Sequence, residues 1–223
     1  MKKNNQIFGI IGVGRFGLAV AEELLQRDKS VIAIDKDPAR LKPLQDTSAE
    51  LFIVEQMSKE ALEETGIQDA DVIVIGIGKD IESSILAALN AKEFGIERVI
   101  CKALSRDHAK ILEKIGAEYI FPETDIGKRL AIRLSSRVTL DVLPLSDEFS
   151  IVQIKVPEYY DGMTVLETNF RKKFNVNIIA VISDGRASGV VGPDTVLKKD
   201  DFIVVCGSNE SLEKLQEEFE RRV

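Results

Sequence analysis

The chain has 223 residues, 44% of them hydrophobic and 30% charged, and a formal net charge of −7. This composition is typical of a globular protein with one domain of ordinary size and a smaller second one. The acidic charge argues against nucleic-acid binding, and a single histidine without a CxxC pair lacks zinc-ligand spacing. No apolar run reaches the roughly 18 residues that a membrane helix needs, so a cytoplasmic protein is expected.

The first half of the sequence alternates short apolar runs with segments of helical periodicity. Strands are predicted over residues 7–11, 31–34, 51–54, 72–75, 99–101 and 119–121, and helices over 16–27, 38–45, 59–65, 81–94 and 106–115. Continuous apolar strands separated by helices indicate a parallel sheet that is covered on both faces. The sequence therefore predicts an α/β fold, a Rossmann-like doubly wound parallel sheet.

A further helix is predicted over residues 124–138, with Ile126, Leu130, Leu134 and Val138 at four-residue spacing. Because it follows the last strand, its apolar stripe is expected to pack outside this domain, against another subunit. The alternative is that it covers the edge of the sheet.

Strands predominate after about residue 140. They are predicted over 150–156, 176–182, 187–191 and 202–206, and a charged helix over 208–221 ends the chain. The turn at residues 183–185 joins two of the strands as a hairpin. We therefore expect a Rossmann domain over residues 1–139, including the interface helix, and a smaller α+β lobe over 140–223.

The most informative motif is the glycine-rich turn after the first strand. Gly12, Gly14 and Gly17 form a GxGxxG pattern that opens a helix, and Asp35 ends the next strand. Gly12 permits the tight turn, Gly14 lets phosphate approach the backbone, and Gly17 lets the helix pack on the sheet, while Asp35 binds ribose hydroxyls and disfavours a 2′-phosphate. The alternatives are glycines that serve turn geometry alone and an aspartate that caps a helix.

Two further features point to the same crevice. Arg15 lies inside the loop, where a fixed cation can meet phosphates; the alternative is a solvated first-turn residue. Residues 75–78 form a second glycine-containing turn after the fourth strand, and strands one and four flank the topological switch point.

Catalytic machinery is hard to find in this sequence. His108 is interpreted as a solvated or helix-capping residue rather than a general base. Cys101 and Cys206 lie in separate strand-like runs and are interpreted as small buried hydrophobic residues rather than a disulfide. Neither a nucleophile elbow nor a Walker lysine motif is present, so binding is favoured over turnover.

Several segments together resemble the RCK family of cytosolic regulators of potassium channels and transporters. They are residues 10–17, with the arginine inside GxGRxG, residues 72–78, 102–103 and 111–117, and the Phe-Pro-Glu at 121–123. Residues 147–152 resemble the start of the family's C-terminal lobe. The match covers essentially the whole chain, and its layout is similar to the KtrA/TrkA type of regulatory subunit.

The resemblance implies a non-enzymatic gating subunit of a membrane potassium transporter or channel. It implies a homo-oligomer, built from dimers into an octameric ring, that docks on the cytosolic face of a membrane ion-translocating subunit. It also implies ATP or ADP in the crevice, with NAD(H) in some relatives. By matched position, Arg15 and Lys102 would address phosphates, Asp35 the ribose, and Glu123 a metal ion or the phosphate side at a dimer interface.

Two parts of the resemblance are weaker. After the third strand the family commonly has a Gly-Asp-Ala-Thr-like turn, whereas residues 54–58 here read Val-Glu-Gln-Met-Ser, which puts base recognition in doubt. Some relatives bind cyclic di-AMP in the C-terminal lobe, and Arg171 and Asn177 resemble that site, although Arg171 is as easily a surface residue.

The candidate nucleotide-binding residues are Gly12, Gly14, Arg15, Phe16, Gly17, Asp35, Lys36, Gly76, Ile77, Gly78, Lys102 and Glu123. Two other functions are kept open: a small NAD-dependent oxidoreductase, and a free-standing nucleotide or redox sensor without a membrane partner.

Overall fold

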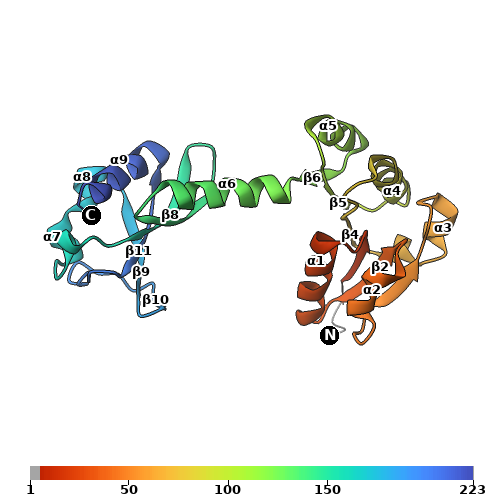
Figure 1. Cartoon of the computed structure of the whole chain (residues 1–223), viewed down its shortest axis with the longest axis horizontal. Coiled ribbons are helices and arrows are strands. Elements are labelled where there is room, and N and C mark those ends of the chain that lie inside the picture. Colours follow the sequence, from red (N-terminus) through yellow and green to blue (C-terminus); the bar gives the residue numbers. More distant parts are fainter. Residues whose placement is uncertain (1–5, 223) are drawn as a thin grey trace. The chain divides into compact units, whose positions relative to one another are not determined.

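The computed structural model describes residues 6–222. Its contacts divide the chain into two compact units, the first ending at Pro122 and the second beginning at Glu123. In Figure 1 the first unit runs from red to green and the second from green to blue. Each unit has its own sheet and its own core, and they are described separately.

The first unit is a six-stranded parallel sheet with helices between the strands (Figure 1). The strands are β1 (Ile7–Ile11), β2 (Ser30–Asp35), β3 (Glu50–Ile53), β4 (Val72–Ile75), β5 (Arg98–Lys102) and β6 (Glu118–Ile120). The helices are α1 (Arg15–Gln26), α2 (Pro38–Leu41), α3 (Lys59–Glu63), α4 (Ile81–Glu93) and α5 (Arg106–Ile115). The strand order β3-β2-β1-β4-β5-β6 is that of the Rossmann fold and confirms the predicted doubly wound sheet.

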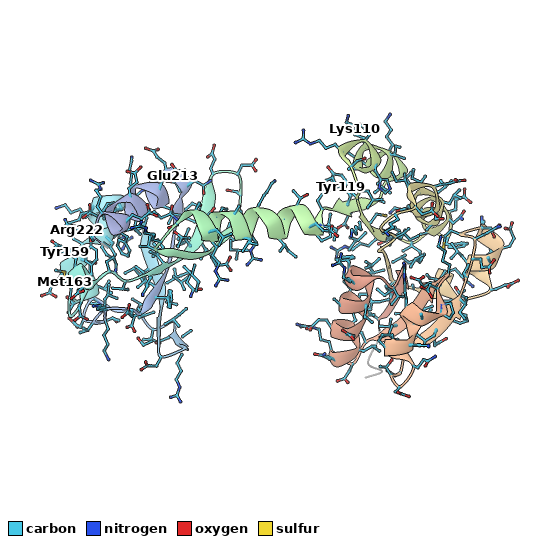
Figure 2. The ribbon with its side chains drawn as sticks, in the orientation of Figure 1. Lys110, Tyr119, Tyr159, Met163, Glu213 and Arg222 are labelled. Atoms are coloured by element: carbon cyan, nitrogen blue, oxygen red, sulfur yellow. The ribbon has the colours of Figure 1, made fainter. Side chains whose placement is uncertain are left out.

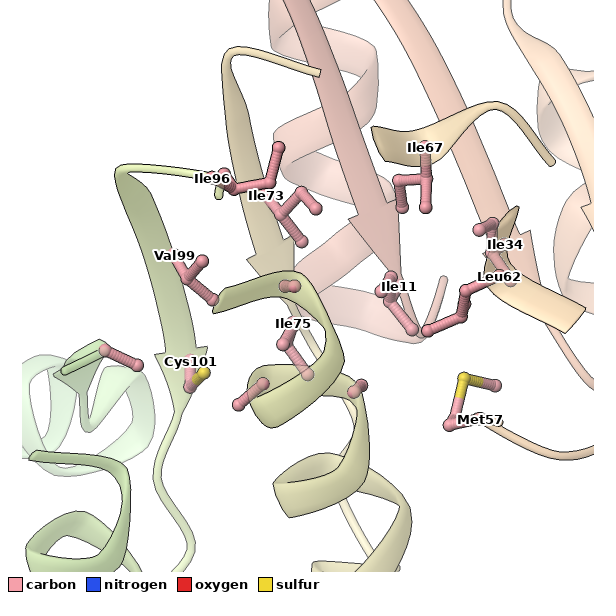
Figure 3. Close-up of a cluster of buried hydrophobic side chains, with 14 of the residues drawn as sticks. Ile11, Ile34, Met57, Leu62, Ile67, Ile73, Ile75, Ile96, Val99 and Cys101 are labelled. Atoms are coloured by element: carbon pink, nitrogen blue, oxygen red, sulfur yellow. The ribbon is translucent and has the colours of Figure 1, made fainter. Parts of the chain in front are cut away.

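Both faces of this sheet are buried, which explains why its strands are continuously apolar. Ile10 packs with residues of α1 and α2 on one face. Its neighbour Ile11 packs on the other face, with residues of α3, α4 and α5. Figure 3 shows Ile11, Ile34 and Ile75 within that second cluster. Successive side chains of a strand point to opposite faces of the sheet. When both faces are buried, these side chains are predominantly apolar and the strand does not alternate between apolar and polar residues.

Helix ends in the first unit follow local chemistry. Pro38 stands at the first position of α2, and Asp37 caps that helix by accepting a hydrogen bond from the Ala39 N–H at 3.0 Å. Gly116 ends α5 with a positive φ of 83°, a backbone conformation that favours glycine. The helix predicted over 38–45 is shorter than expected, because α2 gives way to a 3₁₀ turn at Lys42–Leu44.

The second unit is a five-stranded sheet in the order β10-β9-β11-β8-β7, with antiparallel neighbours, and confirms the predicted smaller α+β lobe. The strands are β7 (Thr139–Pro144), β8 (Phe149–Lys155), β9 (Asn177–Ser183), β10 (Arg186–Ser188) and β11 (Phe202–Ser208). The helices are α6 (Pro122–Ser135), of which Pro122 closes the first unit, α7 (Val165–Thr168), α8 (Phe170–Phe174) and α9 (Asn209–Glu220).

Two local expectations in this region were wrong: helix α6 ends at Ser135 rather than 138, and β10 ends at Ser188 rather than 191. Strand β7 and the short helices α7 and α8 were not predicted. Strand β7 is fixed by its antiparallel pairing with β8 and by Asp141, which accepts two hydrogen bonds from Arg129 of α6, at 2.7 and 3.3 Å. Pairing between separate segments decided this strand, and local periodicity did not reveal it.

The core of the second unit is mainly aliphatic and includes a cluster of aromatic rings. Tyr160, Phe170 and Phe219 are almost fully buried and contact one another, with ring centroids 5.0–5.5 Å apart. At the surface, the Arg222 guanidinium lies 3.9 Å from the ring centroid of Tyr159, and Figure 2 shows the two side chains together. These contacts attach α9 to the segment after β8.

Helix α6 has no buried side chain among the described residues. Ile126, Leu130 and Leu134 are 67%, 51% and 76% exposed. Its contacts with Asp141 place it with the second unit, whereas the sequence grouped it with the first. The domain boundary expected between residues 139 and 140 stays a prediction.

Candidate nucleotide-binding site

Gly12 and Gly76, which directly follow β1 and β4, pack against each other and against Gly17 in the first turn of α1. Gly12 has a φ of +89°, and a Cβ there would lie 2.8 Å from the backbone nitrogen of Ile77. A Cβ at Gly17 would collide with the carbonyl oxygen of Gly12, and one at Gly76 would lie 2.7 Å from the same oxygen. These contacts bring the two glycine turns together at the switch point between β1 and β4. Gly12, Gly17 and Gly76 are thus required by the fold itself.

Gly14 differs from these three glycines. Its φ of −76° and ψ of −170° are open to other residues, and a Cβ there would meet no described atom within 4 Å. Neither backbone strain nor packing therefore explains this glycine. The open space lies directly before the first residue of α1, where an anion can approach the helix N-terminus.

Helix α1 is also uncapped. Among the described residues no side chain accepts a hydrogen bond from its first turn, and that turn has no acidic residue. In contrast, Ser58 caps α3, Asp80 caps α4 and Ser105 caps α5. All of these helices follow strands of the same parallel sheet. The N–H groups and the positive dipole end at the start of α1 thus face the open space beside Gly14, in a geometry suited to phosphate.

Asp35 is buried at the end of β2 and is held by the neighbouring backbone. It accepts hydrogen bonds from the Val13 N–H at 2.7 Å and the Asp37 N–H at 2.9 Å. Its Oδ2 also lies 3.5 Å from a guanidinium nitrogen of Arg40. The carboxylate is therefore a fixed acceptor next to the glycine loop, in the position expected for a ribose ligand. Helix α2 is capped by Asp37, so the capping alternative does not explain Asp35.

An ion pair crosses the end of β1. Lys36 follows β2, Asp80 precedes α4, and their charged atoms are 3.7 Å apart. In the sheet β1 lies between β2 and β4, so this pair joins the two sides of the glycine loop. Hydrogen bonds from the Ser83 N–H and hydroxyl, and to a smaller extent the Lys36 ammonium, hold the pKa of Asp80 below its usual value.

The remaining candidates are distributed around this edge. Arg15 is exposed at the start of α1, and Phe16 packs against the core beside that helix. Gly78 is exposed, and a Cβ there would lie 3.7 Å from the Lys102 amine, so the turn after β4 and the end of β5 meet. Glu123 lies in the first turn of α6, in the second unit, and its role stays a prediction.

His108 corrects the sequence interpretation. It is 2% exposed rather than solvated, and its Nδ1 accepts a hydrogen bond from the Leu104 N–H at 3.3 Å. Its Nε2 has no partner among the described residues. Ser105, not His108, caps α5. Burial lowers the pKa of His108, which favours the neutral ring that holds the turn after Lys102.

The two cysteines differ in burial. Cys101 is fully buried, as expected, and desolvation raises its pKa to about 12. Cys206 is only partly buried, so the expectation of burial was wrong there. A buried thiol of high pKa is chemically inert.

Sequence reasoning missed Arg40, Asp80 and Asn90. The buried amide of Asn90 in α4 donates to the Met57 carbonyl oxygen at 2.8 Å and so fixes the segment after β3 that departs from the family pattern. Asp80 carries a visible signal, an aspartate directly before a helical segment, but its pairing with Lys36 depends on the fold. The described residues contain no group of three or more His, Cys, Asp or Glu that could hold a metal ion.

None of the helices in the described part of the chain is long and apolar enough to cross a membrane.

Comparison with known proteins identifies both units. Residues 8–123 match the TrkA-N domain and residues 149–220 match the TrkA-C domain. The chain is 34% identical over 226 residues to the Ktr system potassium uptake protein C of Bacillus subtilis, covering 100% of this chain and 98% of that protein. It is 30% identical over 217 residues to the Ktr system potassium uptake protein A of the same organism, with 97% of both covered.

A solved structure of the GsuK channel bound to NAD has the same fold. The TM-score is 0.68 at 16% sequence identity, and the match covers 95% of this chain and 39% of that chain. At this identity the likeness concerns the fold alone. The two domain matches and the full-length similarity to the Ktr proteins together show that this chain belongs to the RCK family, as a non-enzymatic regulatory subunit of the KtrA/KtrC type in potassium transport.

Proposed function

We propose that this chain binds an adenine nucleotide in the crevice at the carboxyl ends of β1, β2 and β4, and that the nucleotide gates a membrane potassium transporter. The observation that carries the proposal is Gly14, whose backbone and surroundings tolerate a side chain while the adjacent helix is left uncapped. A glycine that the fold does not need, beside unpaired N–H groups, is the pattern of a phosphate site.

The residues around this space suit the parts of a nucleotide. The buried carboxylate of Asp35 would accept hydrogen bonds from ribose hydroxyls, and Arg15 and Lys102 would face the phosphates. ATP or ADP is the proposed ligand. NAD(H) is the second candidate, supported by a protein of the same fold described as bound to NAD.

The test is a matched pair of variants measured by calorimetry with ADP and ATP. Gly14→Ala adds one methyl group where phosphate would lie, so it should weaken binding at least about tenfold while the unfolding temperature stays near that of the wild type. Gly127→Ala is the control, because a Cβ there also meets no described atom within 4 Å. Unchanged ADP and ATP affinity in a folded Gly14→Ala protein would contradict the proposal, and mass spectrometry of the ligand released on denaturation would separate adenine nucleotides from NAD(H).

The proposed setting is the cytoplasmic face of a membrane, where a homo-oligomer, formed from dimers and closed into an octameric ring, contacts an ion-translocating subunit. The similarity to two Ktr system potassium uptake proteins over nearly their full length supports the membrane partner. The exposed apolar side chains of α6 support association with further copies. Co-purification with a Ktr-type membrane subunit distinguishes this role from that of a free-standing sensor.

A second ligand, cyclic di-AMP, is proposed only for the C-terminal lobe. Arg171 is exposed on α8, and Asn177 is exposed at the start of β9, so both side chains are accessible. Calorimetry of Arg171→Ala with cyclic di-AMP tests this assignment separately from the crevice.

A further inference from the structure

The cations near Asp35 are already paired with carboxylates. Arg40 lies 3.5 Å from Asp35 and 3.7 Å from Asp37, and Lys36 lies 3.7 Å from Asp80. In Rossmann sites the acidic residue after the second strand binds the ribose 2′-hydroxyl, while a nearby cation accommodates a 2′-phosphate. Here each such cation is held by a carboxylate, so a ligand that adds a phosphate at this point meets no unpaired positive charge among these groups.

Asp80 has a particular place in this arrangement. It comes from the other side of the switch point and reaches Lys36 across the end of β1. The same carboxylate is fixed by the Ser83 N–H at 3.0 Å and the Ser83 hydroxyl at 2.8 Å. These two hydrogen bonds hold the Asp80 carboxylate in place, so it attracts the long Lys36 side chain toward α4 and away from Asp35.

We propose that Asp80 is a specificity-determining residue of the nucleotide site: by holding Lys36, it withholds that cation from a ribose 2′-phosphate and restricts the site to nucleotides with a free 2′-hydroxyl. This inference rests on the proposed nucleotide-binding function. It identifies the ligand class as ATP, ADP or NAD(H) rather than their 2′-phosphorylated counterparts.

The experiment compares ADP with 2′-phospho-ADP, which differ in one phosphate, by calorimetry on the full chain. The wild type should prefer ADP. Asp80→Asn keeps a good helix cap but removes the charge that holds Lys36. The ratio of ADP affinity to 2′-phospho-ADP affinity should therefore fall by about two- to fivefold, the effect of an exposed ion pair. Lys36→Met combined with Asp80→Asn should restore the wild-type ratio, because the released cation is then absent.

Two matched variants control for general charge effects. Glu82→Gln removes an exposed acidic charge from the same helix turn, and Lys79→Met removes an exposed cation beside Asp80. Neither should change the ratio of the two affinities. Adding salt should reduce the effect of Asp80→Asn, since the interaction is exposed to solvent.

The outcomes separate this inference from the function on which it rests. If the wild type binds neither ligand, the nucleotide-binding function fails and the inference fails with it. If ADP binds but Asp80→Asn changes the ratio no more than Glu82→Gln, the specificity role of Asp80 is overturned and the function stands. If the ratio of ADP affinity to 2′-phospho-ADP affinity stays reduced in the Lys36→Met/Asp80→Asn double variant, the role of Lys36 is overturned as well.

Discussion

The buried carboxylate of Asp35 accepts a hydrogen bond from the backbone N–H of Val13, at 2.7 Å. These residues are 22 positions apart, and the bond links the end of β2 to the glycine loop after β1. The residue proposed to bind ribose therefore also shapes the loop proposed to bind phosphate. Its substitution should affect stability and ligand binding together.

Asp35→Ala should lower the free energy of unfolding by about 1–3 kcal/mol, because the buried N–H of Val13 loses its acceptor. It should also weaken the binding of ATP and of ADP by the same factor, since both nucleotides contain the ribose. Asp35→Asn keeps one acceptor oxygen and should lose less stability. Urea unfolding and calorimetry measure the two effects, and a selective loss of ATP alone would contradict the ribose assignment.

Gly17→Ala should be far more harmful to the fold than Gly14→Ala. A Cβ at Gly17 collides with the Gly12 carbonyl oxygen, whereas Gly14 faces open space. We expect a loss of about 1–3 kcal/mol or more at Gly17, the cost of overpacking, and little change at Gly14. Thermal unfolding, monitored by circular dichroism, measures the unfolding temperatures of the two variants. Equal unfolding temperatures would show that the turn can relax and that the contact between the two glycine turns is not required.

His108 should make stability fall in mild acid. Burial lowers the pKa of His108 in the folded protein, while in the unfolded chain its pKa lies near the ordinary histidine value of 6.5. The neutral ring's contribution is complete above that value and is lost as the pH falls below it, because the unfolded state then binds the proton more readily. Unfolding measured from pH 7.5 to 5 should show this loss in the wild type.

Variants at His108 separate its charge from its hydrogen bond. His108→Asn does not titrate and can still accept from the Leu104 N–H, so this part of the pH dependence should disappear. His108→Leu leaves that N–H without its acceptor and should be less stable at every pH, by about 1–3 kcal/mol. An identical acid response in wild type and His108→Asn would remove His108 as the cause.

The exposed stripe of α6 should hold copies of the chain together. We expect light scattering to give a dimer or a larger species, and Leu130→Glu with Leu134→Glu to shift it toward the monomer, because these side chains are 51% and 76% exposed. Lys128→Glu on the same helix is the control and should leave the mass unchanged. A wild type that is strictly monomeric at micromolar concentration would refute the interface.

The sequence by itself determined the architecture of the first unit. Its strands are buried on both faces, so they appear as continuous apolar runs, and turn and cap residues such as Pro38 and Gly116 mark the helix ends. The same local logic selected Gly12, Gly14, Gly17 and Asp35 as candidate nucleotide-binding residues, because the dinucleotide-binding motif has a fixed spacing over one strand, turn and helix.

Only the tertiary structure decided which of these residues the fold requires and which it does not. Gly14 and Gly17 are both glycines of the same sequence motif. Gly17 nevertheless packs against the Gly12 carbonyl, whereas Gly14 faces open space. The pairing of Lys36 with Asp80 and the burial of His108 likewise depend on segments that are distant in sequence and meet at one sheet edge. Side-chain charge pairing and desolvation act through space, so they become defined only when strand order has placed those segments together.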